Sequence, residues 1–577
     1  SYAYDAAGRN TRVTDALGNE TRYEYDAAGN LVRMIDARGE VFEYRYDAMN
    51  RPTRTIHPDG SFTETVYDAL GQVVAETDAL GRTTRYAYDG NGNLIRITDP
   101  LGGETRFAYD AEDNLVGQID ARGNRTSFAY DDFGRRIETR YPDGSTETLT
   151  YDAAGNVASE TDASGAITSF EYDAAGRVTR KRFADGSEES FSYSPTGQVL
   201  TATNARGTVR YEYDANDRLT RLENPDGSSI DYAYDAAGNR LSETVRASAG
   251  TPALTTTYSY DVLNRLEAVT DPDGQVTRHA YDLVGNLAAI SHANGVETSF
   301  LYDANNRLRE LRHQESGVTV AGFAYEVNAV GDRTRSTDLV DGSYVEYAYD
   351  ARRRLIRESH FDVAMTRLFQ LEYEYDAVGN RTATIDLGGL RTVYRYDAAD
   401  KLLSAGSTQF LYDASGNRVA RRDLAGQTTY DFDPEDQLVG VTTPNSAVNY
   451  GYDANGQLVE RREGGEVRYL VDPVSPTGHA QVLAEYEAAG IDAHYQFGDR
   501  LLKRRGESSE RYYHGDASRN VRALTDASGS VTDRYRYTAF GELLSATGAS
   551  ANVYGFARER FDPLTSLTYL RARHYDA

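Results

Sequence analysis

Residues 1–200 consist of short segments in which aromatic and polar positions alternate. In residues 21–25, Tyr23 and Tyr25 stand two positions apart, so they share one face of an extended strand. Segments of about six residues are too short for a stable helix and have the usual length of a β-strand. The pattern therefore predicts strands along this whole part of the chain, with little room for anything but tight turns between them.

The tyrosines also define a repeat. Ten of them recur at a fixed interval of 21 residues, namely Tyr4, Tyr25, Tyr46, Tyr67, Tyr88, Tyr109, Tyr130, Tyr151, Tyr172 and Tyr193. All but the last are followed by Asp, and Tyr193 is followed by Ser. A constant period of this length is typical of repeat architectures, in which each unit packs on its neighbours.

Two turn signals divide each repeat. Asp26-Ala27-Ala28-Gly29 follows a tyrosine, and Asp36-Ala37-Arg38-Gly39 stands halfway to the next one. Asp at the first position and Gly at the fourth suit a type I turn, in which Asp caps backbone N–H groups. The Gly adopts the left-handed conformation that closes a hairpin with a bulge. Each repeat is therefore predicted to be one β-hairpin.

The rhythm divides the chain into two regions. A repeat array is predicted over residues 1–468, with a regular period in 1–200 and irregular spacing in 201–468. Residues 469–577 keep little of the 21-residue rhythm and form a separate region.

A meander of this length cannot stay flat. Roughly 45 strands spaced about 4.8 Å apart would make a sheet about 200 Å wide. Open twisted sheets rarely exceed about ten strands, and the strand twist coils a longer ribbon. The predicted fold class is therefore all-β, with tandem hairpins of about 21 residues coiled into a hollow spiral shell. A rod-like solenoid fits the same periodicity and stays open as an alternative.

Composition narrows the range of functions. The chain has 577 residues, a formal net charge of -27 and no Cys. Its acidity disfavours nucleic-acid binding, which needs Lys and Arg against phosphate. The lack of Cys excludes disulfides, thiolate metal sites and cysteine nucleophiles. No run of about 18 apolar residues is present, so no membrane-spanning helix is expected.

No enzyme motif stands out. None of the nine His residues has the His-Glu-x-x-His spacing, and neither a Gly-x-Ser-x-Gly elbow nor a P-loop occurs. His514 and Asp516 could do acid–base work, but a capped turn with a hydrogen-bonded His is the simpler interpretation. Residues 271–274 (Asp-Pro-Asp-Gly) suggest calcium, but the loop spacing of an EF-hand is absent and turn capping is the expected role of these aspartates. We expect no catalytic, cofactor-binding or metal-binding residues in this chain.

The tyrosine ladder allows two interpretations. Aromatic faces in register could stack on sugars, but the chain has no Trp, on which known aromatic repeats of that kind depend. The alternative is that tyrosines of neighbouring hairpins pack on one another as cross-strand pairs. The second interpretation is the expected one.

The region after residue 468 contains four stretches that occur together in a known family. They are Tyr512-Tyr513-His514-Gly515-Asp516, Leu524-Thr525-Asp526-Ala527-Ser528-Gly529, Ala539-Phe540-Gly541 and Leu570-Arg571-Ala572-Arg573-His574-Tyr575-Asp576. With the Tyr-Asp array, they resemble RHS/YD-repeat proteins that end in an RHS-associated core domain. Array and core together cover nearly the whole chain. Such shells occur in bacterial polymorphic toxins and in the C components of insecticidal toxin complexes, and teneurins have a related one.

The resemblance also implies a processing site. In the toxin group, an aspartate motif after the core cleaves the chain and leaves the toxin inside the shell. Asp576 matches the first aspartate of that motif, and Arg573 would lie beside the cleavage centre. The second aspartate would follow Ala577, so the core-like region is expected to be truncated at its C-terminal end and not to cleave itself. The sequence departs from the family pattern at 557–560 and 565–566, where the family usually has Gly-Glu or Gly-Gln and Thr-Gly.

These observations lead to one functional hypothesis and one alternative. The first is the structural, non-enzymatic shell of a secreted or surface-exposed bacterial protein, closed by the core-like region around a C-terminal toxin of the same polypeptide. A secretion-system or toxin-complex partner and an immunity protein would then be its partners. The alternative is a cell-surface adhesin that binds a carbohydrate or a receptor. Neither hypothesis includes nucleic-acid binding by this region.

Overall fold

The structure is a computed structural model that describes residues 1–248, 250–487, 490–506, 509–571 and 573–577. These residues contain 55 strands and one short 3-10 helix, η1 (Phe556–Arg558). Fifty-two of the strands form a single antiparallel sheet in which each strand pairs with the next along the chain. The all-β prediction of tandem hairpins is confirmed.

The sheet winds into a first coil, a second coil and a core region. The first coil consists of β1 (Tyr2–Tyr4), β2 (Asn10–Thr14), β3 (Glu20–Tyr25), β4 (Leu31–Ile35), β5 (Val41–Tyr46), β6 (Pro52–Ile56), β7 (Phe62–Tyr67), β8 (Val73–Thr77), β9 (Thr83–Tyr88), β10 (Leu94–Thr98), β11 (Glu104–Tyr109), β12 (Leu115–Ile119), β13 (Arg125–Tyr130), β14 (Arg136–Arg140), β15 (Thr146–Tyr151), β16 (Val157–Thr161), β17 (Ile167–Tyr172), β18 (Val178–Arg182), β19 (Glu188–Tyr193), β20 (Val199–Asn204), β21 (Gly207–Tyr213), β22 (Leu219–Glu223), β23 (Ser229–Tyr234) and β24 (Arg240–Arg246).

The second coil and the core region continue the same sheet. The second coil consists of β25 (Leu254–Tyr260), β26 (Leu266–Thr270), β27 (Val276–Tyr281), β28 (Leu287–Ser291), β29 (Val296–Tyr302), β30 (Leu308–Glu315), β31 (Val318–Val327), β32 (Arg333–Asp338), β33 (Tyr344–Tyr349), β34 (Leu355–Phe361), β35 (Arg367–Tyr375), β36 (Arg381–Asp386), β37 (Arg391–Tyr396), β38 (Leu402–Ala405), β39 (Thr408–Tyr412), β40 (Arg418–Asp423), β41 (Gly426–Phe432), β42 (Leu438–Thr442), β43 (Ala447–Tyr452), β44 (Leu458–Arg462) and β45 (Glu466–Asp472). The core region consists of β46 (Gln481–Glu487), β47 (Gly490–Phe497), β48 (Leu501–Gly506), β49 (Glu510–Gly515), β50 (Val521–Thr525), β51 (Val531–Tyr537) and β52 (Leu543–Thr547), followed by η1 and the strands β53 (Arg560–Asp562), β54 (Leu567–Tyr569) and β55 (His574–Tyr575).

The turn between β3 and β4 illustrates why each repeat folds as a hairpin. The Gly29 N–H donates to the carbonyl of Asp26 at 3.1 Å, and Gly29 has a φ of 95°. The Asp26 carboxylate accepts the Asn30 N–H at 2.9 Å, and the strand register shifts next to Tyr25. This is the predicted Asp-capped turn with a left-handed glycine and a bulge.

The tyrosines bind the preceding hairpin rather than one another. The Tyr25 hydroxyl donates to the carbonyl of Asn10 at 2.9 Å, and the same bond recurs from Tyr46 to Leu31. The Arg9 guanidinium lies 4.9 Å from the centre of the Tyr25 ring. The expected tyrosine–tyrosine pairs are therefore wrong for most of the ladder, because the previous repeat offers a carbonyl to the hydroxyl and, at rings such as Tyr25 and Tyr67, an arginine as well.

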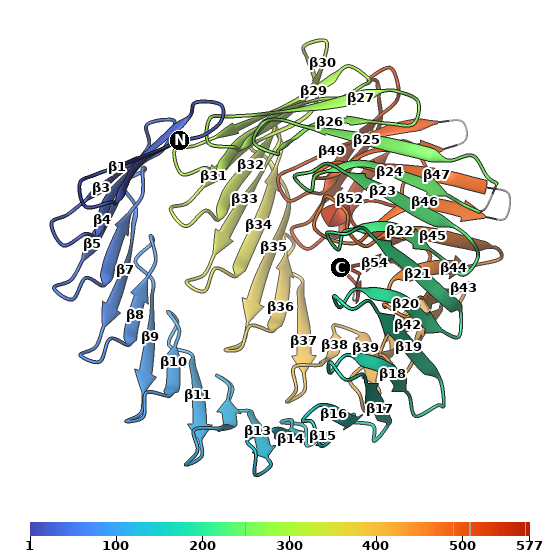
Figure 1. Cartoon of the computed structure of the whole chain (residues 1–577), viewed down its shortest axis with the longest axis horizontal. Coiled ribbons are helices and arrows are strands. Elements are labelled where there is room, and N and C mark those ends of the chain that lie inside the picture. The colour runs from blue at the N-terminus through green and yellow to red at the C-terminus, as the bar shows by residue number, and fades with distance from the viewer. Residues whose placement is uncertain (249, 488–489, 507–508, 572) are drawn as a thin grey trace.

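The first and second coils meet edge to edge along a seam (Figure 1). Its contacts connect residues about 250 to 275 positions apart in the sequence, from 248 for Arg307 and Asp59 to 275 for Arg122 and Asp397. They join Arg38 to Asp303 and Ala304, Asp59 to Arg307, Arg82 to Asp350, Asp99 to Arg352, Arg122 to Asp376, Asp143 to Lys401, Asp162 to Ser415, Lys181 to Glu435 and Arg206 to Glu460. The sheet therefore forms the hollow spiral that the sequence predicts, and a straight solenoid is excluded.

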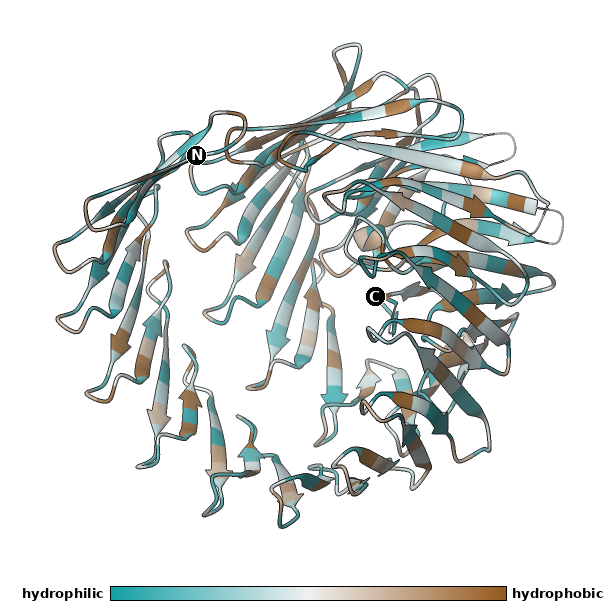
Figure 2. Ribbon diagram, viewed as in Figure 1, coloured by the Kyte–Doolittle hydropathy of each residue, from teal (hydrophilic) through white to brown (hydrophobic). Residues whose placement is uncertain are grey.

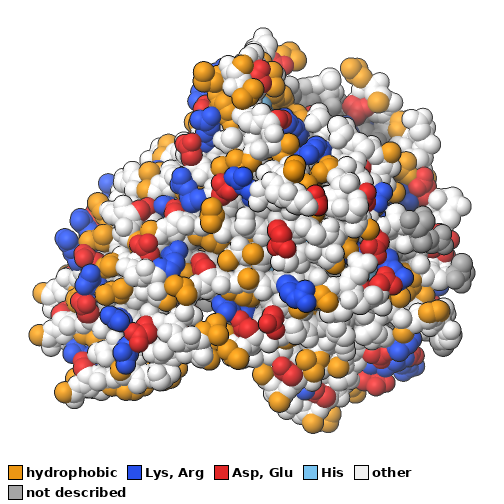
Figure 3. Space-filling view, turned by 90° about the horizontal axis from the view of Figure 1, so that it is seen from above, with side chains coloured by type: hydrophobic (Ala, Val, Ile, Leu, Met, Phe, Trp, Pro, Cys, Tyr) orange, Lys and Arg blue, Asp and Glu red, His pale blue; other side chains and the backbone are white. Residues whose placement is uncertain are grey.

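Burial is concentrated late in the chain. The largest hydrophobic cluster includes Ile230, Val245, Leu470, Leu483 and Tyr495, each at most 1% exposed. It joins the end of the first coil to the core region. Elsewhere apolar and polar residues alternate along the strands (Figure 2), and one outer view shows charges of both signs interspersed (Figure 3). Among the described residues, no helix is long and apolar enough to cross a membrane.

Candidate functional site

The C-terminal segment forms a small sheet of its own that lies on the wall of the second coil. β53, β54 and β55 pair with one another, and Asp562 fixes this sheet to the wall. The Arg461 guanidinium donates to both oxygens of Asp562, at 2.7 and 3.2 Å, and the Tyr450 hydroxyl donates at 2.8 Å. Figure 1 places the C-terminal end inside the ring that the coils outline, so we call this face of the sheet the inner face.

A cavity of about 760 Å³ lies between the end of this segment and the wall. Both residues that the resemblance singled out, Arg573 and Asp576, line it. Its aromatic and charged lining includes Tyr412, Arg418, Tyr430, Phe432, Glu435, Tyr452, Tyr569, His574 and Tyr575. The Asp576 carboxylate accepts from the Arg418 guanidinium at 2.9 Å, so the last aspartate is tied to β40. Residue 572 of this motif lies outside the described residues.

Burial controls the ionisation of the groups around the cavity. It lowers the pKa of His574 to about 4, so this imidazole is neutral at neutral pH. The ring lies 5.2 Å from those of Tyr450 and Tyr569, measured between centroids. Burial opposes the ionisation of Asp562, but the hydrogen bonds from Arg461 outweigh it and lower the pKa of this carboxyl. The site thus combines anchored charges with aromatic surfaces, an arrangement suited to holding an extended peptide.

The two departures from the family pattern each include a residue with a left-handed backbone conformation. Arg558 and Ser566 both have a φ of 58°, in the left-handed region that favours glycine. A residue with a side chain adopts this conformation at a cost of about 1 kcal/mol or more. A left-handed backbone at these positions accounts for the glycines of the family pattern, and here Arg558 and Ser566 adopt it.

The other predicted candidates take structural roles. The Asp516 carboxylate accepts the backbone N–H groups of Ser518 and Asn520, as a turn cap does, and pairs with Arg522 at 3.1 Å. His514 instead bonds to the Thr525 hydroxyl at 2.8 Å. The structure therefore separates the two members of the proposed acid–base pair.

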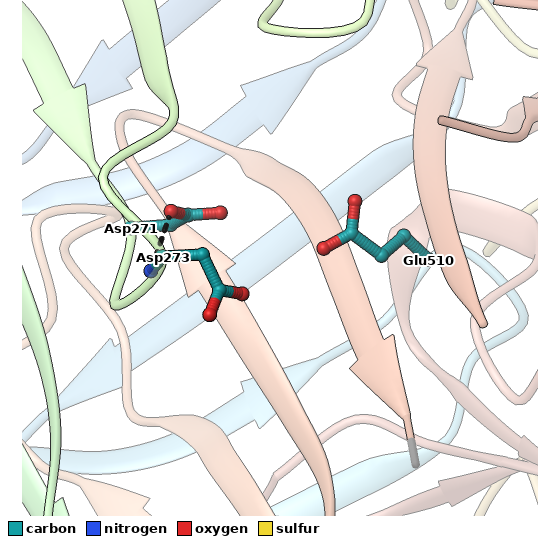
Figure 4. Close-up of side chains that lie close together, drawn as sticks. All are labelled: Asp271, Asp273 and Glu510. Carbon is teal, nitrogen blue, oxygen red and sulfur yellow. Dashed lines mark hydrogen bonds between the residues drawn. The ribbon is translucent and has the colours of Figure 1, made fainter. Parts of the chain in front are cut away.

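The turn at residues 271–274, the alternative candidate for calcium, forms an ion-pair cluster. Asp271 and Asp273 lie near Glu510 from the core region (Figure 4). Lys503 binds Asp271 at 2.6 Å and Glu510 at 2.7 Å, and Arg505 binds Asp273 at 2.9 Å. A cation would have to displace these side chains, so the carboxylates fit the ion pairs better than a metal.

Sequence reasoning missed the residues of the wall that hold the C-terminal segment. Arg418, Tyr450 and Arg461 belong to ordinary hairpins and carry no local signal that separates them from other repeats. Only the contact with a segment more than 100 residues later reveals their role, as in the Tyr450–Asp562 bond across 112 positions.

The chain belongs to the family of YD-repeat shells. The teneurin YD-shell family profile matches residues 234–370 and 343–577. RHS repeats match in eight segments between residues 4 and 252, some of which overlap. The resemblance drawn from the sequence is confirmed.

Among curated proteins, the tRNA3(Ser)-specific nuclease WapA of Bacillus spizizenii is 30% identical over 240 residues, which cover 40% of this chain and 10% of that protein. Mouse Teneurin-4 is 23% identical over 288 residues, or 48% of this chain and 10% of that protein. The matches thus span about a tenth of these relatives' length. The solved structure of TcdB2-TccC3 covers all of this chain and 34% of its own, with a TM-score of 0.65 at 15% identity. At that identity, the likeness supports the shell fold alone.

Proposed function

We propose that this chain is the wall of a bacterial toxin shell and that it encloses an effector carried further along the same polypeptide. The observation that carries this proposal is the position of the C-terminal segment on the inner face, where Arg461 and Arg418 anchor Asp562 and Asp576. A chain that continued from Ala577 would leave from this inner face. Curated relatives such as WapA are nucleases by name, which favours an effector carried by the same polypeptide.

The lining of the wall is consistent with this role. Tyr450 faces the C-terminal segment and stands two positions before Tyr452, as Tyr23 stands before Tyr25. Alternate residues of a strand share one face, so tyrosines recur along the inner face of the array. Aromatic side chains with a polar tip offer contacts to an unfolded chain without requiring one particular sequence. In this proposal the wall holds the effector, and the effector carries the chemistry.

Processing would occur at the cavity beside Arg573 and Asp576. In this proposal Asp576 is positioned by Arg418 and acts together with a group that follows residue 577. Secretion, a toxin-complex partner and an immunity protein belong to the same proposal.

The test uses the natural polypeptide that contains these residues. Its mass under denaturing conditions is compared with its size on a native column, for the parent and for an Asp576→Asn variant. We expect two fragments, cleaved near residue 577, that elute together, and a single uncleaved chain for the variant. Fragments that separate on the native column, or an uncleaved parent with an exposed downstream segment, would contradict enclosure and favour an adhesin.

A further inference from the structure

Three buried histidines meet where the core region joins the second coil. His292 follows β28, His313 lies in β30 and His514 lies in β49, and each side chain is buried. The His514 ring lies 5.2 Å from that of His292 and 4.9 Å from that of His313, measured between centroids. Two layers of the spiral that are about 200 residues apart in sequence thus meet through imidazoles, as in the bond from His313 to Gly515 across 202 positions.

The hydrogen bonds around these rings are satisfied by neutral imidazoles. His313 Nε2 lies 3.0 Å from the carbonyl of Gly515, which can only accept, so this nitrogen carries the proton. His313 Nδ1 therefore accepts from the Thr298 hydroxyl at 2.7 Å. A second proton on His313 would turn Nδ1 into a donor, so the Thr298 hydroxyl would have to rotate and accept, and the added positive charge would stay buried. His292 Nδ1 and His514 Nδ1 are buried and have no partner among the described residues, so a proton added there would also lack an acceptor.

The charged groups around the rings make protonation still less favourable. Arg558 of η1 packs directly against Gly515 and forms no ion pair with any described carboxylate, and Arg500 adds a second positive charge nearby. The nearby carboxylates already have cationic partners, since Asp516 pairs with Arg522 at 3.1 Å and Asp499 with Arg500 at 2.5 Å. A fourth buried imidazole, that of His279, faces Asp499 at 3.6 Å.

We propose that His292, His313 and His514 form an acid-operated latch, which holds the core region to the second coil at neutral pH and releases it when the rings take up protons. The latch lies within a polar contact between the second coil and the core region. There Asn294 donates to Thr525 at 2.9 Å, and Arg534 donates to the Val320 carbonyl at 2.8 Å. Three positive charges close together beside Arg558 would repel one another and separate the core region from the second coil. The latch does not depend on what the shell encloses.

The direction of the pH effect follows from linkage. Burial lowers the pKa of all three rings, that of His313 to about 4 from an ordinary value of 6.5. The open state, with hydrated rings, therefore binds more protons, and the closed state loses stability as the pH falls from 6.5 toward 4. For a ring with these two pKa values, opening becomes about 20-fold more favourable at pH 5 than at pH 7. Because three rings take up protons on opening, the latch should open over a narrow range of pH.

The test measures the distance between the second coil and the core region in the full chain. The protein has no Cys, so Ser299→Cys on β29 and Ala527→Cys after β50, both exposed, can carry two spin labels without competition. Pulsed electron resonance would give the label separation at about pH 7.5 and about pH 5. We expect one short separation at neutral pH and a longer, broader distribution in acid.

Matched variants separate the latch from general acid effects. The triple variant His292→Gln, His313→Gln, His514→Gln cannot take up these protons and should keep the short separation at about pH 5. The single variant His514→Gln, which disturbs the fold least, should move the midpoint of opening to lower pH, and His479→Gln, at an exposed turn, should not move it. An unchanged parent separation in acid, or opening of the single and triple variants at the parent's midpoint, would overturn the proposal.

Discussion

The first 200 residues and the core region use the same hairpin but are stabilised differently. In the first 200 residues, Phe183 is the only hydrophobic side chain that is buried among those described. In the core region, Leu483, Tyr495 and Leu524 are fully buried. The regular wall is one sheet thick, so its inner and outer faces both remain partly open. In the core region, other segments of the chain cover the sheet, and the side chains between them pack like an ordinary protein interior.

This difference shows how a long wall can be built without a thick hydrophobic core. Along the regular array, the tyrosine at the end of each repeat makes the same bond to the hairpin before it, as Tyr25 and Tyr46 do. Stability then adds up from neighbour to neighbour along the array. The core region instead depends on contacts between distant segments, so single substitutions there should have larger effects.

The largest effect is expected where the first coil meets β45. Arg240 is buried and pairs with Glu243 and Asp472, each at 2.7 Å. Burial already raises the pKa of Glu243 to about 7, and Arg240→Met would leave two buried carboxylates without their cation. We expect a loss of about 3–5 kcal/mol, because breaking a buried pair leaves uncompensated charge. Urea unfolding would measure it, and adding Glu243→Gln should restore part of the loss.

The next effect tests packing in the core region. Leu483 is 0% exposed, and Leu483→Ala should cost about 2–5 kcal/mol through lost burial and a cavity. Leu17→Ala, at a turn tip where the side chain is 53% exposed, should change stability by less than about 0.5 kcal/mol. Hydrogen exchange of β46 and of β2 would give the two local values. Equal losses at both sites would remove the distinction between wall and core.

A smaller effect is expected from one bond of the regular wall. Tyr109→Phe removes the hydroxyl that donates to the Leu94 carbonyl at 3.0 Å. The loss should be about 0.5–1.5 kcal/mol and should stay local, because this bond joins a hairpin only to the one before it along the chain. Exchange of β10–β12 should rise while that of β18 does not. Tyr2→Phe, at a ring that is 66% exposed, is the matched control.

The smallest effect concerns the seam between the coils. The Lys401 ammonium, then the Ser145 hydroxyl, lower the pKa of Asp143 to about 2 from 3.8. The contribution of Asp143 to stability is therefore complete above pH 3.8 and is lost as the pH falls toward 2. Lys401→Met should cost about 0.2–1 kcal/mol, and less in high salt. A pH profile of unfolding identical to that of the parent below pH 4 would argue against this contact.

The repeat unit could be predicted almost completely from sequence. The Tyr-Asp period, the capping aspartate and the glycine specify a hairpin locally, and Asp26 and Gly29 form the predicted turn. The length of one coil could not be predicted, because it depends on small twists summed over more than 20 strands. The residues that meet across the seam, such as Arg122 and Asp376, are therefore invisible in the sequence.

The candidate site was only partly predictable. The family motif indicated Arg573 and Asp576, whose roles remain a proposal. The wall residues that hold them come from ordinary repeats, and their partners are set by how the spiral closes on itself. The three latch histidines were visible only as isolated residues, because His292 and His514 meet through folding alone. The division of the chain at residue 468 also remains a prediction.

The most direct test of the shell is electron cryomicroscopy of the natural polypeptide that contains residues 1–577. The proposed function predicts density inside the ring of strands, in contact with the tyrosine-bearing inner face and continuous with the segment near Asp576. An empty interior, with the downstream segment folded outside the wall, would contradict enclosure.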